Sequence, residues 1–142
     1  MAVRKDAKTT QAGSGRKAHA FRDTYFVIMA GGKGERFWPL STQLVPKPIV
    51  SLTGRKTLIE LTVDRARRIV PLDHIFVVLG GEHLPIAKKC LPRLPGENFI
   101  IEPVGRDTAP CVGLAAATLR RRNPGSVMVV LPSDHYVPDE AG

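Results

Sequence analysis

The sequence lacks several features that would indicate particular classes of protein. Its 142 residues include only two cysteines, Cys90 and Cys111. They form no C-x-x-C pair, so neither a zinc knuckle nor a redox motif is indicated. The longest apolar runs, at 75–79 and 127–131, are far shorter than the roughly 18 residues that a membrane-spanning helix needs. We therefore expect buried free thiols in a cytoplasmic protein, with no transmembrane segment and no membrane partner.

Acidic residues are also scarce, and much of the resulting charge imbalance lies near the N-terminus. The formal net charge is +8, and residues 1–23 hold six basic against two acidic side chains, which gives +4. This segment has almost no large apolar residues, so it cannot bury enough surface to offset its ordering entropy. We expect a disordered basic tail at 1–23 and one domain at 24–142. An ordinary flexible extension is favoured over a transit peptide or a nucleic-acid-binding arm.

Short apolar segments alternate with segments of helical period from residue 25 onward. Strands are expected at 25–29, 74–79, 98–101 and 127–131, since these runs are rich in Val, Ile and Phe. A capping box at Thr57 and Glu60 predicts a helix that continues to Pro71. Further helices are expected at 84–91, with Pro85 in the first turn, and at 109–122. This order predicts an α/β fold with a Rossmann-like, doubly wound, mostly parallel sheet.

The last predicted helix carries two more expectations. Thr108 is expected to cap it, and its inner face is expected to hold four residues, Val112, Ala115, Ala116 and Leu119. Its three C-terminal arginines are interpreted as a solvated helix end stabilised by the macrodipole, rather than as a nucleic-acid patch.

A glycine-rich loop follows the first predicted strand, where doubly wound sheets bind ligands. Its glycines allow backbone N–H groups to approach a phosphate chain, and the positively charged guanidinium of Arg36 can donate two hydrogen bonds to phosphate oxygens. A Walker A pattern is absent, and Phe37 stands where a dinucleotide fingerprint needs its third glycine. Taken alone, the loop fits a structural turn equally well.

Three further loops strengthen the interpretation as a binding site. Lys47 follows closely and can reach the same phosphates. The polar loop at 102–110 leads into a helix N-terminus, which suits anions and base edges. After the last strand, Asp134 is well placed to hold Mg²⁺, although a helix or turn cap is its alternative role. For His135, the alternatives are a supporting residue behind the site and a core histidine.

Four motifs in this order resemble those of the mannose-1-phosphate guanylyltransferases, within the sugar-phosphate nucleotidyltransferases: Gly31 to Ser41, Pro46-Lys47, Glu102 to Pro110 and Pro132 to His135. The resemblance covers about residues 25 to 137. It implies transfer of GMP from GTP to mannose 1-phosphate, giving GDP-mannose and pyrophosphate. It implies catalytic roles for Arg36 and Lys47, and Mg²⁺ binding by Asp134. The implied nucleotide-binding residues are Ala30, Gly31, Gly32, Gly34, Arg36, Lys47, Arg106, Asp107, Thr108 and Ala109.

The resemblance is not complete. Glu35 stands where many relatives carry Thr or Ser, and Pro48 where many carry Gln. In the family, the sugar-binding residues and a second metal-binding carboxylate lie further along the chain, so the sequence is expected to be a truncated nucleotide-binding part that is inactive alone. A UTP- or dTTP-dependent glucose-1-phosphate nucleotidyltransferase and a non-catalytic nucleotide-binding module stay open as alternatives. GTP and mannose 1-phosphate are the expected partners, nucleic acid is not, and a homo-oligomer is left open.

Overall fold

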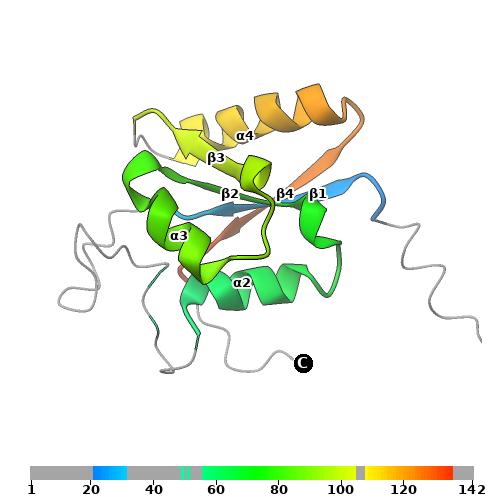
Figure 1. Cartoon of the computed structure of the whole chain (residues 1–142). Helices are drawn as coiled ribbons and strands as arrows, with labels where there is room; N and C mark the ends of the chain where they lie inside the picture. The colour runs from blue at the N-terminus through cyan, green and yellow to red at the C-terminus, as the bar shows by residue number, and fades with distance from the viewer. Residues whose placement is uncertain (1–20, 32–48, 50, 52–55, 105–107, 136–142) are drawn as a thin grey trace, which may run out of the picture.

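The computed structural model describes residues 21–31, 49, 51, 56–104 and 108–135. In these residues, one parallel sheet contains β1 (Thr24–Met29), β2 (Ile75–Gly80), β3 (Phe99–Glu102) and β4 (Val127–Pro132), in the order β3-β2-β1-β4 (Figure 1). Each strand begins and ends within one residue of its predicted bounds, so the predicted strands are confirmed. Of the tail proposed at 1–23, residues 1–20 lie outside the described residues and residues 21–23 form a turn before β1, so the division into tail and domain stays a prediction.

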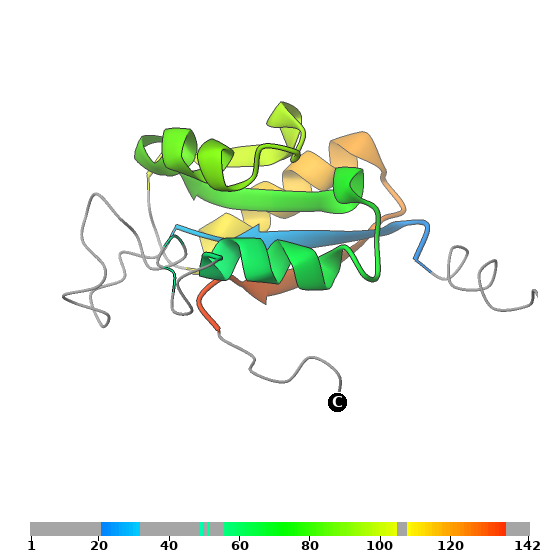
Figure 2. The same cartoon turned by 60° about the horizontal axis from the view of Figure 1, so that its bottom comes forward.

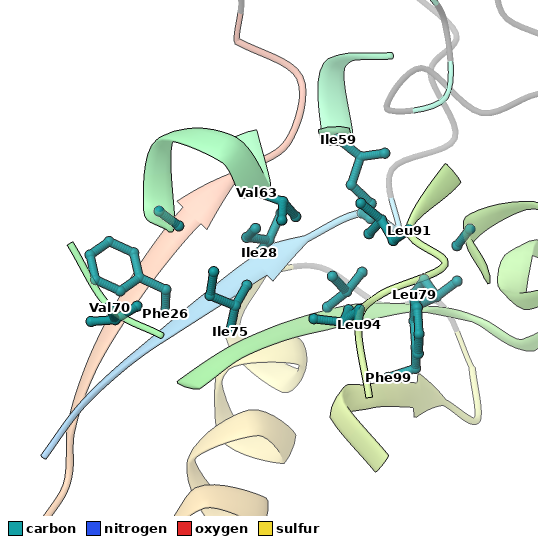
Figure 3. Packing of buried hydrophobic residues seen from close by; sticks show 14 residues of the cluster. Phe26, Ile28, Ile59, Val63, Val70, Ile75, Leu79, Leu91, Leu94 and Phe99 are labelled. Carbon is teal, nitrogen blue, oxygen red and sulfur yellow. The ribbon is translucent and has the colours of Figure 1, made fainter. Parts of the chain in front are cut away.

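Helices cover both faces of the sheet (Figures 1 and 2). The helices α2 (Leu58–Ala66) and α3 (Leu84–Cys90) pack on one face, and α4 (Thr108–Arg122) packs on the other. Because side chains alternate along a strand, Phe26 and Ile28 join the first core, shown in Figure 3, while Tyr25 and Val27 join the second. The doubly wound α/β architecture is therefore confirmed. None of the helices in the described residues is long and apolar enough to cross a membrane.

The helix α2 begins as predicted but ends early. The backbone N–H of Thr57 donates to the Glu60 carboxylate at 2.7 Å, and the Thr57 hydroxyl accepts from the backbone N–H of Glu60 at 3.4 Å, which completes the capping box. The predicted extension to Pro71 is wrong, since α2 ends at Ala66. Beyond it the backbone tightens into turns, in which the N–H of Ile69 bonds to the carbonyl of Ala66, three residues back.

The inner face of α4 differs from the prediction. Its buried residues are Cys111, Ala115 and Leu119, which recur every four positions and so share one face of the helix. Ala116 is exposed, so its predicted place on the inner face is wrong. Thr108 is the first residue of α4 rather than the residue before it. The thiol of Cys111 is buried as expected, whereas Cys90 is only partly buried.

The C-terminal end of α4 contacts the sheet through Arg122. The guanidinium of Arg122 lies over the ring of Phe76, 5.4 Å from its centroid, and donates to Oδ1 of Asn98 at 3.1 Å. Asn98 is fully buried and donates to the carbonyls of Asp73 and Ile75 at 3.0 and 2.8 Å. All three arginines are exposed, as expected for a solvated helix end, and Arg122 in addition forms an anchor at the amino edge of the sheet.

Candidate functional site

The strand order places a topological switch point between β1 and β4. From β1 the chain continues to β2 and then β3 on one side, whereas β4 returns to the other side of β1. The ends of β1 and β4 are in register, with Met29 opposite Pro132. In doubly wound sheets, ligands bind in the crevice beyond the carboxyl ends of strands at such a point. The residues that follow β1 and β4 are therefore the first candidates for a site.

The carboxyl end of β1 is fixed on both sides. Toward β2, the N–H of Ala30 donates to the carbonyl of Val78 at 2.8 Å. Toward β4, the carbonyl of Met29 accepts from the backbone N–H of Ser133 at 3.2 Å and from its hydroxyl at 2.5 Å. Ala30 and Gly31, two predicted nucleotide-binding residues, thus leave the sheet from a rigid position.

A buried carboxylate lies beside Gly31. Glu102, at the end of β3, is 8% exposed, and burial raises the pKa of its carboxyl group. A Cβ on Gly31 would be only 2.7 Å from Oε2 of Glu102, so glycine permits this close approach. No hydrogen bond or ion pair joins the Glu102 carboxyl group to any other residue in the described part of the chain. The site therefore contains a buried acceptor that a ligand could satisfy.

The first turn of α4 lies at the same edge. Thr108 and Ala109 are both exposed there, and the first turn itself has no acidic residue, so the partial positive charge of the helix N-terminus favours anions. Cys111, in the same turn, is buried next to Glu102. Burial, with a further contribution from the Glu102 charge, raises the pKa of its thiol to about 11. At neutral pH this thiol stays protonated, so it is no nucleophile.

Asp134 lies just beyond the end of β4. Its side chain is 39% exposed, and Nε2 of His135 lies 3.7 Å from its Oδ1. The side chain of His135 is 71% exposed, so it is not a core histidine. Within the described residues, no group of three or more His, Cys, Asp and Glu side chains could hold a metal ion. A cation at Asp134 would therefore take its remaining ligands from elsewhere, as Mg²⁺ does when it bridges one carboxylate to substrate phosphates.

The predicted site residues divide into two groups. Ala30, Gly31, Thr108, Ala109 and Asp134 are described, and they all follow the carboxyl ends of strands. The others, Gly32, Gly34, Arg36, Lys47, Arg106 and Asp107, lie outside the described residues, and their roles stay predictions. Two further residues of the motifs, Glu102 and Ser133, had no predicted role. For both, the available signal was a polar side chain directly after an apolar strand.

Comparisons with known proteins agree with this architecture. The family model for nucleotidyl transferases matches residues 25–141. The mannose-1-phosphate guanylyltransferase of Escherichia coli (strain K12) is 41% identical over 120 residues, which cover 82% of this chain and 25% of the relative. The alginate biosynthesis protein AlgA of Pseudomonas putida is 38% identical over 116 residues, or 80% of this chain and 24% of that protein. The chain thus spans about a quarter of the length of these relatives.

A solved structure shows the same fold. It is described as a mannose-1-phosphate geranyltransferase from Thermus thermophilus, with a TM-score of 0.71 and 40% sequence identity. The similarity covers 82% of this chain and 34% of that one.

Proposed function

Because the chain belongs to the nucleotidyl transferase family, we propose that it forms the nucleotide-binding part of an enzyme that transfers GMP from GTP to mannose 1-phosphate. GDP-mannose and pyrophosphate are the products. The observation that carries the proposal is that Gly31, Glu102 and Asp134 all lie at the carboxyl ends of strands in one parallel sheet, with Gly31 after β1 and Asp134 after β4 on the two sides of the switch point. The similarity to mannose-1-phosphate guanylyltransferases supports the choice of nucleotide and sugar phosphate.

In this proposal the phosphates of GTP lie above the ends of β1 and β4. The N–H groups of Gly31, Gly32 and Gly34 and the side chains of Arg36 and Lys47 contact them, while the loop at 106–109 and the α4 N-terminus lie near the nucleoside. An oxygen of the mannose 1-phosphate monoester attacks the α-phosphorus of GTP, and the bond to pyrophosphate breaks. The monoester is largely dianionic at neutral pH, so the step requires no general base. Catalysis then comes from positioning and charge neutralisation.

A magnesium ion fits the Asp134 end of the site. The Asp134 carboxylate is a hard oxygen donor that is partly exposed beyond the end of β4. Mg²⁺ is commonly held by one or two carboxylates together with substrate phosphates and water. When bound, the ion would neutralise negative charge on the GTP phosphates.

Glu102 supports guanine as the base. Guanine presents two neighbouring donors, the N1–H and the N2 amino group, which match the two oxygens of a carboxylate. Uracil and thymine present one N–H between two carbonyl oxygens, and a carboxylate repels those oxygens. A largely buried Glu102 carboxylate beside Gly31, with no hydrogen-bond partner among the described residues, therefore favours GTP over the UTP- and dTTP-dependent alternatives.

Binding and turnover test the proposal separately. The 142-residue chain should bind GTP more tightly than UTP or dTTP, and added Mg²⁺ should increase its affinity for GTP. It should show no steeply salt-dependent binding to duplex DNA. Turnover should appear in a chimera in which this chain replaces the matching segment of the Escherichia coli relative, followed as pyrophosphate release dependent on mannose 1-phosphate. Preference for UTP or dTTP would overturn the proposed nucleotide, and binding without turnover in the chimera would favour a non-catalytic module.

A further inference from the structure

Ser133 makes an unusual connection between two distant parts of the sequence. Its hydroxyl donates to the carbonyl of Met29 at 2.5 Å, which joins residues 104 positions apart. Ser133 is 1% exposed, so water does not compete for this bond. The bond ties the segment just beyond β4 to the last residue of β1, at the point where the glycine loop begins.

The backbone on the far side of Asp134 is also held. The carbonyl oxygen of His135 lies 3.5 Å from Nη2 of Arg65, and the same nitrogen donates to the Thr62 hydroxyl on α2 at 2.9 Å. Asp134 thus lies between two attachments, one to β1 and one to α2. These contacts restrain the backbone on both sides of Asp134 while its carboxylate remains partly exposed, an arrangement that suits a ligand-binding side chain.

The Ser133 hydroxyl adds little to the pairing of the strands. The ladder between β1 and β4 runs from Thr24 to Met29, and the backbone N–H of Ser133 already satisfies the Met29 carbonyl at 3.2 Å. Removing the hydroxyl therefore leaves no buried carbonyl without a partner.

We propose that Ser133 is a positioning residue for the cation site. Its hydroxyl fixes the direction in which Asp134 leaves the sheet, so that the carboxylate meets a cation carried by the phosphates above β1. The inference rests on the proposed function, since it takes Asp134 as the ligand. Groups that orient metal ligands commonly change metal affinity by about 10- to 100-fold when they are removed.

The test is a titration of GTP binding with Mg²⁺ in the 142-residue chain. Mg²⁺ should increase the affinity of the chain for GTP, and the titration gives the Mg²⁺ concentration at half of this increase. In Ser133→Ala this concentration should rise on the order of tenfold. At saturating Mg²⁺, GTP affinity should return close to that of the wild type, which a merely structural defect would not allow. In Asp134→Asn, Mg²⁺ should no longer increase GTP affinity. Ser133→Thr keeps the hydroxyl and should therefore show most of the wild-type response to Mg²⁺.

The matched control is Thr118→Val. The Thr118 hydroxyl donates to the carbonyl of Leu114 within α4 at 2.9 Å, so the substitution deletes a similar bond away from Asp134, and its Mg²⁺ response should be that of the wild type.

Each failure has a distinct meaning. If Asp134→Asn loses the response while Ser133→Ala retains it, the positioning role is overturned and the metal site stands. If Ser133→Ala unfolds, or loses GTP affinity equally with and without Mg²⁺, the hydroxyl has a structural role only and the inference is wrong. If neither the wild type nor Asp134→Asn responds to Mg²⁺, the proposed metal site itself fails, and the inference fails with it.

Discussion

The substitution Glu102→Gln tests the proposed base preference most directly. Gln has nearly the same shape as Glu, but it replaces one acceptor oxygen with an NH₂ donor and removes the charge. Glu102 is buried against Gly31 and α4, so the new side chain should stay in place. The variant therefore changes the chemistry presented to the base with little change in packing.

The magnitude follows from the lost hydrogen bonds. A hydrogen bond to a charged group contributes about 1.5–3 kcal/mol, and in the variant one guanine donor would face an NH₂ group instead of an oxygen. At 1.4 kcal/mol per tenfold change, GTP affinity should fall by about 10- to 100-fold. Inosine triphosphate lacks the N2 amino group, so the wild type should prefer GTP to ITP and the variant should bind the two nearly alike. Calorimetric titration of both nucleotides measures this directly.

The same variant should be more stable than the wild type at neutral pH. Burial raises the folded-state pKa of Glu102 above its ordinary value of 4.5. The protonated carboxyl therefore favours folding below that value, and this contribution is lost as pH rises through the folded-state pKa. Gln does not ionise, so this loss is absent in the variant. The urea concentration at the unfolding midpoint, followed by circular dichroism, should therefore rise in the variant relative to the wild type as pH increases from 4 to 7.

The exposed residue Glu97 provides a matched control, because Glu97→Gln removes the same charge at the amino end of β3. It should leave the ratio of GTP to ITP affinity unchanged. If Glu102→Gln folds but keeps the wild-type ratio of GTP to ITP affinity, Glu102 does not contact the base, and the argument for guanine from this carboxylate is refuted.

Other consequences concern catalysis, the core and the thiols. In the chimera, Arg36→Ala should lower turnover on the order of a hundredfold or more, measured as pyrophosphate release, and near-normal turnover would leave Arg36 a structural role. Asn98→Ala removes three hydrogen bonds of a fully buried side chain and should lower the free energy of unfolding by about 2–4 kcal/mol, whereas a loss within the surface range of about 0.5 kcal/mol would contradict the anchor at the amino edge. With maleimide at neutral pH, Cys90 should react before the buried Cys111, and equal rates in the folded chain would contradict the burial of Cys111.

The strands could be predicted from the sequence because each is a short run of apolar residues rich in Val, Ile and Phe. The inner strands β1 and β2 are buried on both faces, whereas the edge strands β3 and β4 are only partly covered. The start of α2 was equally predictable, since the capping box depends only on Thr57 and Glu60. The end of α2 was not, because apolar spacing continues past Ala66 while the backbone tightens into turns. In α4, alanines fit either face, so only the packing distinguishes buried Ala115 from exposed Ala116.

The site was less predictable because it depends on which strands are neighbours. The sequence shows polar residues after each strand, and it shows the glycine loop after β1. It does not show that β4 pairs with β1, which alone brings Ser133 to the Met29 carbonyl. The approach of Glu102 to Gly31 likewise requires β3 to lie beyond β2 in the same sheet. Local motifs thus predict where the site lies, and strand order determines which of the described side chains lie close together there.

Strand order also separates two tasks within the site. Glu102 is the last residue of β3, and Ser133 follows β4. Because β1 and β2 lie between these strands, the two backbones are about 14 Å apart at roughly 4.8 Å per strand. Sites at this separation whose side chains do not contact one another usually contribute independently. The double variant Glu102→Gln/Ser133→Ala should therefore lose GTP preference over ITP as much as the first single variant does. It should also show the Mg²⁺ shift of the second, with the two free-energy changes additive. Clear non-additivity in GTP titrations across Mg²⁺ would mean that base and cation are held by one coupled network, and the division of the site by strand order would then be wrong.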